Sequence, residues 1–148
     1  MKDSQYYAKC WLDRTKGCQL KIDALDRKRQ IVQNSVSGVS KYSAKESTSD
    51  HYENATEAAF CEFSMLSEMI EKEQNVLAYE DKKTLEVISQ LESASQQAIL
   101  IDRYVNRLSW SAISEHQNYS ESYIKTIHSD ALAAIYDKIP PDELIMTA

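Results

Sequence analysis

Glycine and proline are scarce in this sequence, with two of each among 148 residues. Tight turns between strands are built largely from these residues, so the chain has few places to turn one strand into the next. Long apolar runs are also missing, and residues 1–11 interleave apolar and charged side chains. That pattern matches neither a signal peptide nor a membrane anchor. We therefore expect an all-α protein that stays in the cytoplasm and enters no membrane.

Residue sets that carry out chemistry are scarce as well. The cysteines and histidines lack the spacing of metal ligands; they are Cys10, Cys18, Cys61, His51, His116 and His128. The sequence has no glycine-rich phosphate loop and no nucleophile turn. We expect no metal, no cofactor and no enzymatic activity.

Basic residues are outnumbered, with 17 Lys and Arg against 23 Asp and Glu and a net charge of −6. A protein that held nucleic acid by overall charge would be basic, so any contact with DNA has to be local.

The first 92 residues show two amphipathic stretches separated by a polar one. The first stretch predicts a helix over about 4–33, from apolar positions spaced four and three apart: Trp11, Thr15, Cys18, Ile22, Leu25, Arg29 and Val32. The second predicts a helix from about 53 towards 92, from Ala59, Phe63, Leu66, Ile70, Leu77, Ile88 and Leu91. Between them, 34–52 is rich in serine, contains a glycine and predicts a flexible loop.

Two such helices would bury their apolar sides against each other as a long antiparallel helical hairpin over 1–92. Aromatic residues on them could pack within one chain or against a second copy, which leaves open a homodimer through the hairpin; they are Tyr6, Tyr7, Trp11, Phe60 and Phe63.

Residues 93–139 predict three short helices, over 94–105, 109–116 and 120–135, followed by a C-terminal tail at 140–148. The short connections are typical of a compact helix-turn-helix module. Ser109 and Ser120 stand where N-caps are needed, and Asn118 stands in the turn, where a left-handed conformation is common.

The exposed face of the last helix is the candidate DNA-binding surface, because the second helix of this motif enters the major groove. Arg103 and Arg107 are the candidate phosphate contacts before it. The candidates on or beside the helix are Ser120, Glu121, Ser122, Tyr123, Lys125, Thr126, His128 and Ser129. Among these residues, His128 could add a contact to a phosphate.

Residues 91–135 resemble the fourth region of sigma-70-type factors, which reads promoter −35 elements. The resemblance lies in ILIDRY at 99–104, LSWSAIS at 108–114, YS at 119–120 and AL at 131–132. It implies a sigma-like module that binds double-stranded DNA beside RNA polymerase. In sigma factors, residues just inside the recognition helix contact bases and phosphates. The positions of this sequence that match them are Glu121, Ser122, Lys125 and Thr126, so the resemblance implies the same contacts here.

A second resemblance covers nearly the whole chain. Trp11-Leu12-Asp13, the charged helix after it, the serine-rich loop and the long second helix are similar to a sigma-like family of Gram-positive phages that is close to the ArpU-like late transcription regulators. This resemblance implies a phage-type transcription regulator that acts with host RNA polymerase in the host cell cytoplasm.

The last helix departs from the sigma pattern, which is rich in Arg and Lys: residues 120–135 hold only Lys125, against Glu121 and Asp130. Affinity would then come from a dimer or from RNA polymerase. Two other readings stay open: a small terminase-like DNA-packaging subunit, and a DNA-independent protein-interaction or inhibitor protein, which the acidic balance favours.

Overall fold

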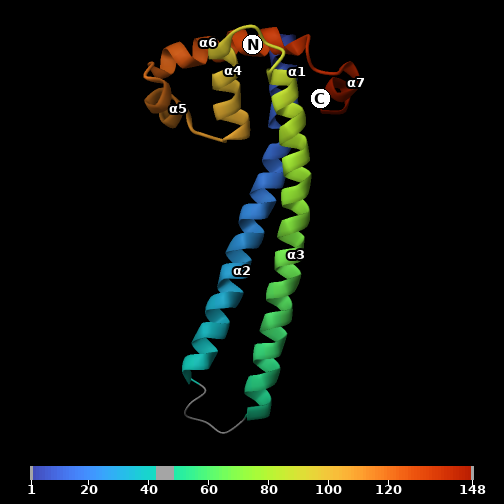
Figure 1. The fold of residues 1–148 in the computed structure, drawn as a ribbon, viewed down its shortest axis with the longest axis vertical. Coiled ribbons are helices and arrows are strands. Elements are labelled where there is room, and N and C mark those ends of the chain that lie inside the picture. Colours follow the sequence, from blue (N-terminus) through green and yellow to red (C-terminus); the bar gives the residue numbers. More distant parts are fainter. Residues whose placement is uncertain (1, 43–48, 148) are drawn as a thin grey trace. The chain divides into compact units, whose positions relative to one another are not determined.

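The computed structural model describes residues 2–42 and 49–147. Every regular element in these ranges is a helix, which confirms the all-α class (Figure 1). In chain order they are α1 (Asp3–Leu12), the 3₁₀ turn η1 (Asp13–Thr15), α2 (Lys16–Tyr42), α3 (Ser49–Ile88), α4 (Ala94–Leu100), the π-helical turn η3 (Ile101–Val105), α5 (Trp110–Gln117), α6 (Glu121–Tyr136) and α7 (Pro141–Thr147). Within the described ranges, no helix combines the length and the apolar character that crossing a membrane requires.

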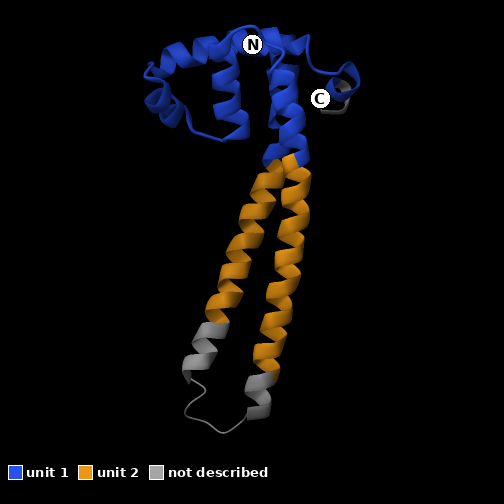
Figure 2. Cartoon of the chain, viewed as in Figure 1, with its two compact units in different colours: residues 1–16, 79–148 blue, residues 17–78 orange. Residues whose placement is uncertain are grey.

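The chain divides into two compact units, shown in Figure 2. One is Gly17–Ala78, and the other joins Met1–Lys16 to Tyr79–Ala148. The predicted boundary at 92 differs from this division, because residues 1–16 and 79–92 belong with the C-terminal part. The physical reason is a shared core: Trp11 and Ile88 are fully buried in the same cluster as Leu132.

The Gly17–Ala78 unit pairs α2 with α3. Where burial is described in this unit, the buried apolar residues are Ile22, Val32, Leu66 and Ile70. Lys21 Nζ lies 2.7 Å from Glu73 Oε1 and Lys28 Nζ lies 3.8 Å from Glu62 Oε1. Arg29 Nη1 donates to Ser67 Oγ at 3.3 Å. Later residues of α2 thus meet earlier residues of α3, as expected of antiparallel helices.

The predicted loop at 34–52 is shorter in the structure, since α2 continues to Tyr42 and α3 begins at Ser49. The remainder of that prediction, 43–48, lies outside the described residues. Serine has only a moderately lower helix propensity than alanine, so a serine-rich stretch can still extend a helix. The predicted helix over 4–33 is also interrupted, by η1 between α1 and α2.

The second unit is built around α1. Ala8, Trp11 and Leu12 form its buried face, and each is at most 1% exposed. Helix α1 contacts α6 and α7. The core that these helices share comprises Ala8, Trp11, Leu12, Val87, Ile88, Leu91, Leu100, Tyr104, Ala131, Leu132, Ile135 and Ile139.

The predicted C-terminal tail is instead the helix α7, which is tied to the core through Glu143. Trp11 Nε1 donates to Glu143 Oε2 at 2.9 Å, and Lys83 Nζ lies 2.6 Å from Glu143 Oε1. The Lys83 ammonium and the indole donor hold the pKa of Glu143 below its ordinary value. The Glu143 carboxylate of α7 thus accepts from one side chain of α1 and one of α3, and it joins the three helices.

Trp11→Ala should destabilise the protein by about 3–5 kcal/mol, because it removes a large buried side chain and the donor to Glu143. The control is Tyr6→Ala on the same helix, where the ring is 54% exposed and the cost should be under about 1 kcal/mol. Urea unfolding measures both. Similar losses in the two variants would contradict the placement of α1 in the core.

Candidate nucleic-acid interface

Helices α5 and α6 form a helix-turn-helix, and local chemistry sets both of its helix starts. Ser109 Oγ accepts from the Ala112 amide at 3.1 Å, and Ser120 Oγ accepts from the Tyr123 amide at 3.2 Å. Asn118 ends α5 in the left-handed conformation, with φ 58° and ψ 38°. All three predictions are confirmed. A separate small core of fully buried Ile99, Ile113 and Ile124 fixes α4, α5 and α6 together.

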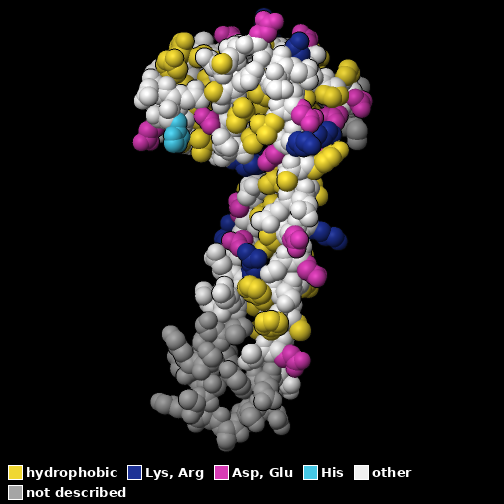
Figure 3. Space-filling model, viewed as in Figure 1, with side chains coloured by type: hydrophobic (Ala, Val, Ile, Leu, Met, Phe, Trp, Pro, Cys, Tyr) yellow, Lys and Arg dark blue, Asp and Glu magenta, His cyan; other side chains and the backbone are white. Residues whose placement is uncertain are grey.

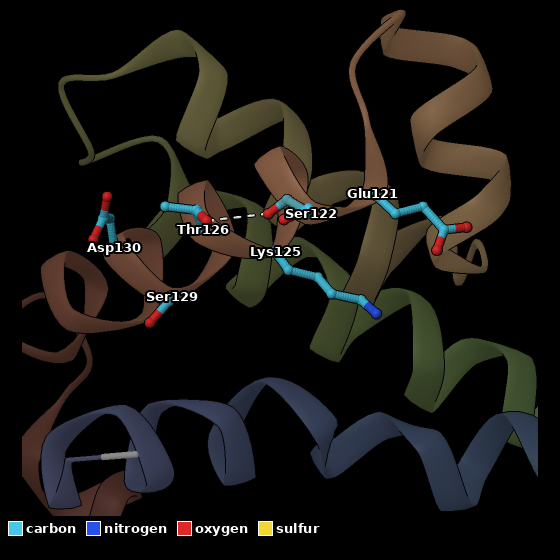
Figure 4. Close-up of a pocket in the computed structure, with 6 residues that line it drawn as sticks. All are labelled: Glu121, Ser122, Lys125, Thr126, Ser129 and Asp130. Carbon is cyan, nitrogen blue, oxygen red and sulfur yellow. Dashed lines mark hydrogen bonds between the residues drawn. The ribbon is translucent and has the colours of Figure 1, made fainter.

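Helix α6 is apolar on one side and polar on the other. The inner side is buried and consists of Ile124, His128, Ala131, Leu132 and Ile135. The outer side is exposed and lines a shallow depression (Figure 4), formed by Glu121, Ser122, Lys125, Thr126, Ser129 and Asp130. Thr126 Oγ1 donates to the Ser122 carbonyl at 3.0 Å, so this hydroxyl presents its lone pairs outwards. The structure therefore gathers five of the predicted residues on one surface.

Arg107 has a structural role that the sequence did not indicate. Its Nη2 lies 2.9 Å from Asp81 Oδ1 and 3.3 Å from Thr15 Oγ1. Its φ is 58°, in the left-handed region where a helix commonly ends on glycine. The Leu108 amide then bonds to the Asp102 carbonyl at 2.9 Å and closes the helix end. The ion pair and hydrogen bonds engage Nη1 and Nη2 of the guanidinium that we expected at a phosphate, and its Nε is buried without a hydrogen-bond partner among the described residues.

Arg103 is also engaged within the fold. Its guanidinium carbon lies 4.4 Å from the centroid of the Trp110 ring, and Nη1 donates to the Leu108 carbonyl at 3.0 Å. The side chain is half-buried. Arg103 thus orders the start of α5, and only its remaining N–H groups could meet a phosphate.

The expected phosphate contact from His128 is wrong, because the side chain is buried, with 8% exposure. Its Nε2 lies 2.7 Å from the Tyr104 hydroxyl, and the Trp110 ring meets it edge-on at 4.7 Å between centroids. Burial, reinforced by the charges of Arg103 and Lys9, lowers the pKa of His128 to about 4. The same burial raises the pKa of the Tyr104 hydroxyl. The sequence indicated this burial, because His128 is four residues from both Ile124 and Leu132 and so lies on the apolar side of the helix.

The outer face of α6 has a neighbour that sequence reasoning missed. The Gln5 side chain of α1 donates through Nε2 to both the carbonyl and the hydroxyl of Ser129, each at 2.9 Å. The prediction had assigned α1 to the hairpin, so nothing in the sequence brought these positions together. Tyr123, a further predicted contact, is half exposed and lies against the ring of exposed Tyr119, with 5.0 Å between centroids.

Charges on the face drawn in Figure 3 are mixed, with Lys and Arg in small groups among Asp and Glu. Within the described residues, no cluster of three His, Cys, Asp or Glu side chains could hold a metal ion. Comparisons of the chain with protein-family models, with curated proteins and with solved structures found no match. The function therefore has to be argued from this surface.

The buried imidazole makes stability pH-dependent. Because the folded pKa of His128 lies below that of an unfolded histidine, the unfolded state binds the extra proton first, and stability falls as the pH drops from about 6.5 to about 4. We expect a loss on the order of 2–3 kcal/mol over this range. Urea unfolding at several pH values measures it, with His128→Gln as the non-titrating control. Equal pH dependence in the two proteins would contradict a buried neutral imidazole.

Proposed function

We propose that this protein is a non-enzymatic, sequence-specific transcription regulator that binds double-stranded DNA with α6 and acts together with RNA polymerase. The observation that carries the proposal is the outer face of α6, which projects hydrogen-bonding side chains from a capped, firmly packed helix-turn-helix. The resemblance of residues 91–135 to the fourth region of sigma factors, and of nearly the whole chain to a sigma-like phage family, supports the same function.

The side chains on α6 suit base readout in the major groove. Lys125 is exposed and can donate to the acceptors of guanine. Glu121 can accept from the amino group of cytosine. Thr126 donates its hydroxyl proton to the Ser122 carbonyl. The lone pairs of the hydroxyl oxygen and the methyl group remain available to contact a base edge.

Phosphate neutralisation supplies less affinity to this protein than to a basic helix-turn-helix. Arg107 is paired with Asp81 and His128 is neutral inside the core, so neither adds to the charge that meets DNA. Each neutralised phosphate contributes about −0.9 to the salt slope of binding. A protein with so few contacts needs a second source of affinity, and RNA polymerase or a second copy of the chain can provide it.

The Gly17–Ala78 unit offers a surface for such a partner. Met65, Met69 and Val76 lie on α3 with between 39% and 54% exposure. Exposed methionines on a helix are frequent at adaptable protein-binding surfaces. We assign this unit to protein contact and α6 to DNA contact.

A second candidate function is a DNA-independent protein-interaction or inhibitor protein. The net charge of −6 and the internal use of Arg107 favour it, because both reduce attraction to DNA. Under this reading the outer face of α6 would meet a protein.

The deciding experiment incubates the protein with sheared phage and bacterial DNA, with and without RNA polymerase, and sequences the retained DNA. We expect a discrete retained site that is lost in Lys125→Ala/Thr126→Ala, since these side chains read base edges. The matched control is Lys82→Ala/Ser89→Ala, which removes an exposed lysine and an exposed hydroxyl near the end of α3, outside the Gly17–Ala78 unit, and should retain the site.

Retention of the same site by the α6 variant would contradict base readout by α6. Absence of any discrete site in both conditions would contradict the regulator function and favour the second candidate.

A further inference from the structure

Gln5 links the first turn of α1 to the outer face of α6. Its Oε1 accepts from the Lys2 amide at 2.9 Å, while its Nε2 donates to Ser129. One carboxamide therefore orders the start of α1 and holds it beside the depression that Ser129 lines. Ser129 is one of the residues proposed to face DNA.

Two lysines share the stripe of α1 that Gln5 occupies. Lys9 follows Gln5 by four residues, a spacing that places both side chains on one side of the helix, while Lys2 is the N-cap of α1 and its amide is bonded to the Gln5 side chain. Both lysines are exposed, and among the described residues neither forms an ion pair. The hydrogen bonds from Gln5 to Ser129 place this stripe on the α6 side of α1.

The stripe adjoins the part of α6 that carries Lys125 and Ser129. Figure 4 shows Ser129 on the side of α6 that faces the dark blue ribbon of α1, and Asp130 on the opposite side. Of the two acidic side chains of this depression, Asp130 is thus turned away from α1. An anion that approaches between α1 and α6 would meet the Ser129 hydroxyl and the ammonium groups of the lysines.

The distribution of charge along the chain agrees with this placement. Residues 2–16 carry four basic side chains and two acidic ones, whereas 81–148 carry six basic and ten acidic ones. Since Ala8, Trp11 and Leu12 are buried, α1 is a fixed element whose lysines need little ordering on binding.

We propose that α1 is a second DNA-contacting element, in which Lys2 and Lys9 neutralise phosphates that flank the groove entered by α6. Lys2 and Lys9 are seven positions apart, about 10 Å along the helix axis, enough to reach separate phosphates. The inference rests on the proposed function, and it supplies part of the affinity that the arginines of the helix-turn-helix do not.

The test measures binding of a fluorescein-labelled, mixed-sequence duplex of about 30 base pairs by anisotropy, at salt concentrations from about 25 to 200 mM. For Lys2→Ala/Lys9→Ala we expect the salt slope to fall by about two and affinity at low salt to fall roughly tenfold. Lys2→Arg/Lys9→Arg should restore both. The matched control Lys72→Ala/Lys82→Ala removes two exposed lysines of α3 and should leave both unchanged. All four substituted positions are exposed, and thermal melting verifies that each variant is folded.

The failure of this inference is distinguishable from that of the proposed function. An unchanged slope in Lys2→Ala/Lys9→Ala, together with a slope reduced by about one in Lys125→Ala, would overturn the role of α1 and leave α6 as the DNA-binding element. No binding of the unaltered protein at 25 mM salt would also overturn it, and the retention experiment with RNA polymerase then decides the proposed function.

Discussion

The burial of α1 against α6 is the contact on which the rest of the second unit depends. Trp11 and Leu12 cover the same core as Leu132 and Ile135, so the inner face of α6 is held by a segment more than a hundred residues away in sequence. With that face occupied, the polar side of α6 is exposed, and within the described residues Gln5 of α1 contacts it at Ser129. The contact is also the reason that Gln5 reaches Ser129.

The charge that the second unit presents at its surface depends on which basic side chains are already engaged within the fold. Arg14 lies 3.0 Å from Glu80, Arg107 is paired with Asp81, and Arg103 stacks on Trp110. Arginine suits such roles, because its planar group donates in several directions and stacks on aromatic rings. The side chains that would ordinarily grip phosphates therefore stabilise this unit, and exposed lysines are left for DNA. The regulator that we propose would therefore bind free DNA weakly and would need a partner for affinity.

Local features of the second unit could be predicted from the sequence, and distant ones could not. The serine caps of α5 and α6, the left-handed Asn118 and the outer face of α6 depend on neighbours within a few residues, so the pattern was sufficient. Trp11 was assigned to the hairpin because helical periodicity cannot tell which of two surfaces a buried face will meet. Arg107 was misassigned because its partners Asp81 and Thr15 are distant in sequence. The burial of His128 could have been predicted, because its position falls among the apolar residues on the inner side of α6.

The central claim, that α6 meets DNA through its outer face with α1 beside it, is tested most directly by nuclear magnetic resonance. The backbone amides of the full chain would be followed while a duplex carrying the retained site is added. The account predicts that shifts concentrate on Ser122, Lys125, Thr126 and Ser129, and on Lys2 and Lys9, while Ile113 and the α2–α3 pair stay unchanged. Shifts confined to α2 and α3, with α6 unaffected, would contradict it.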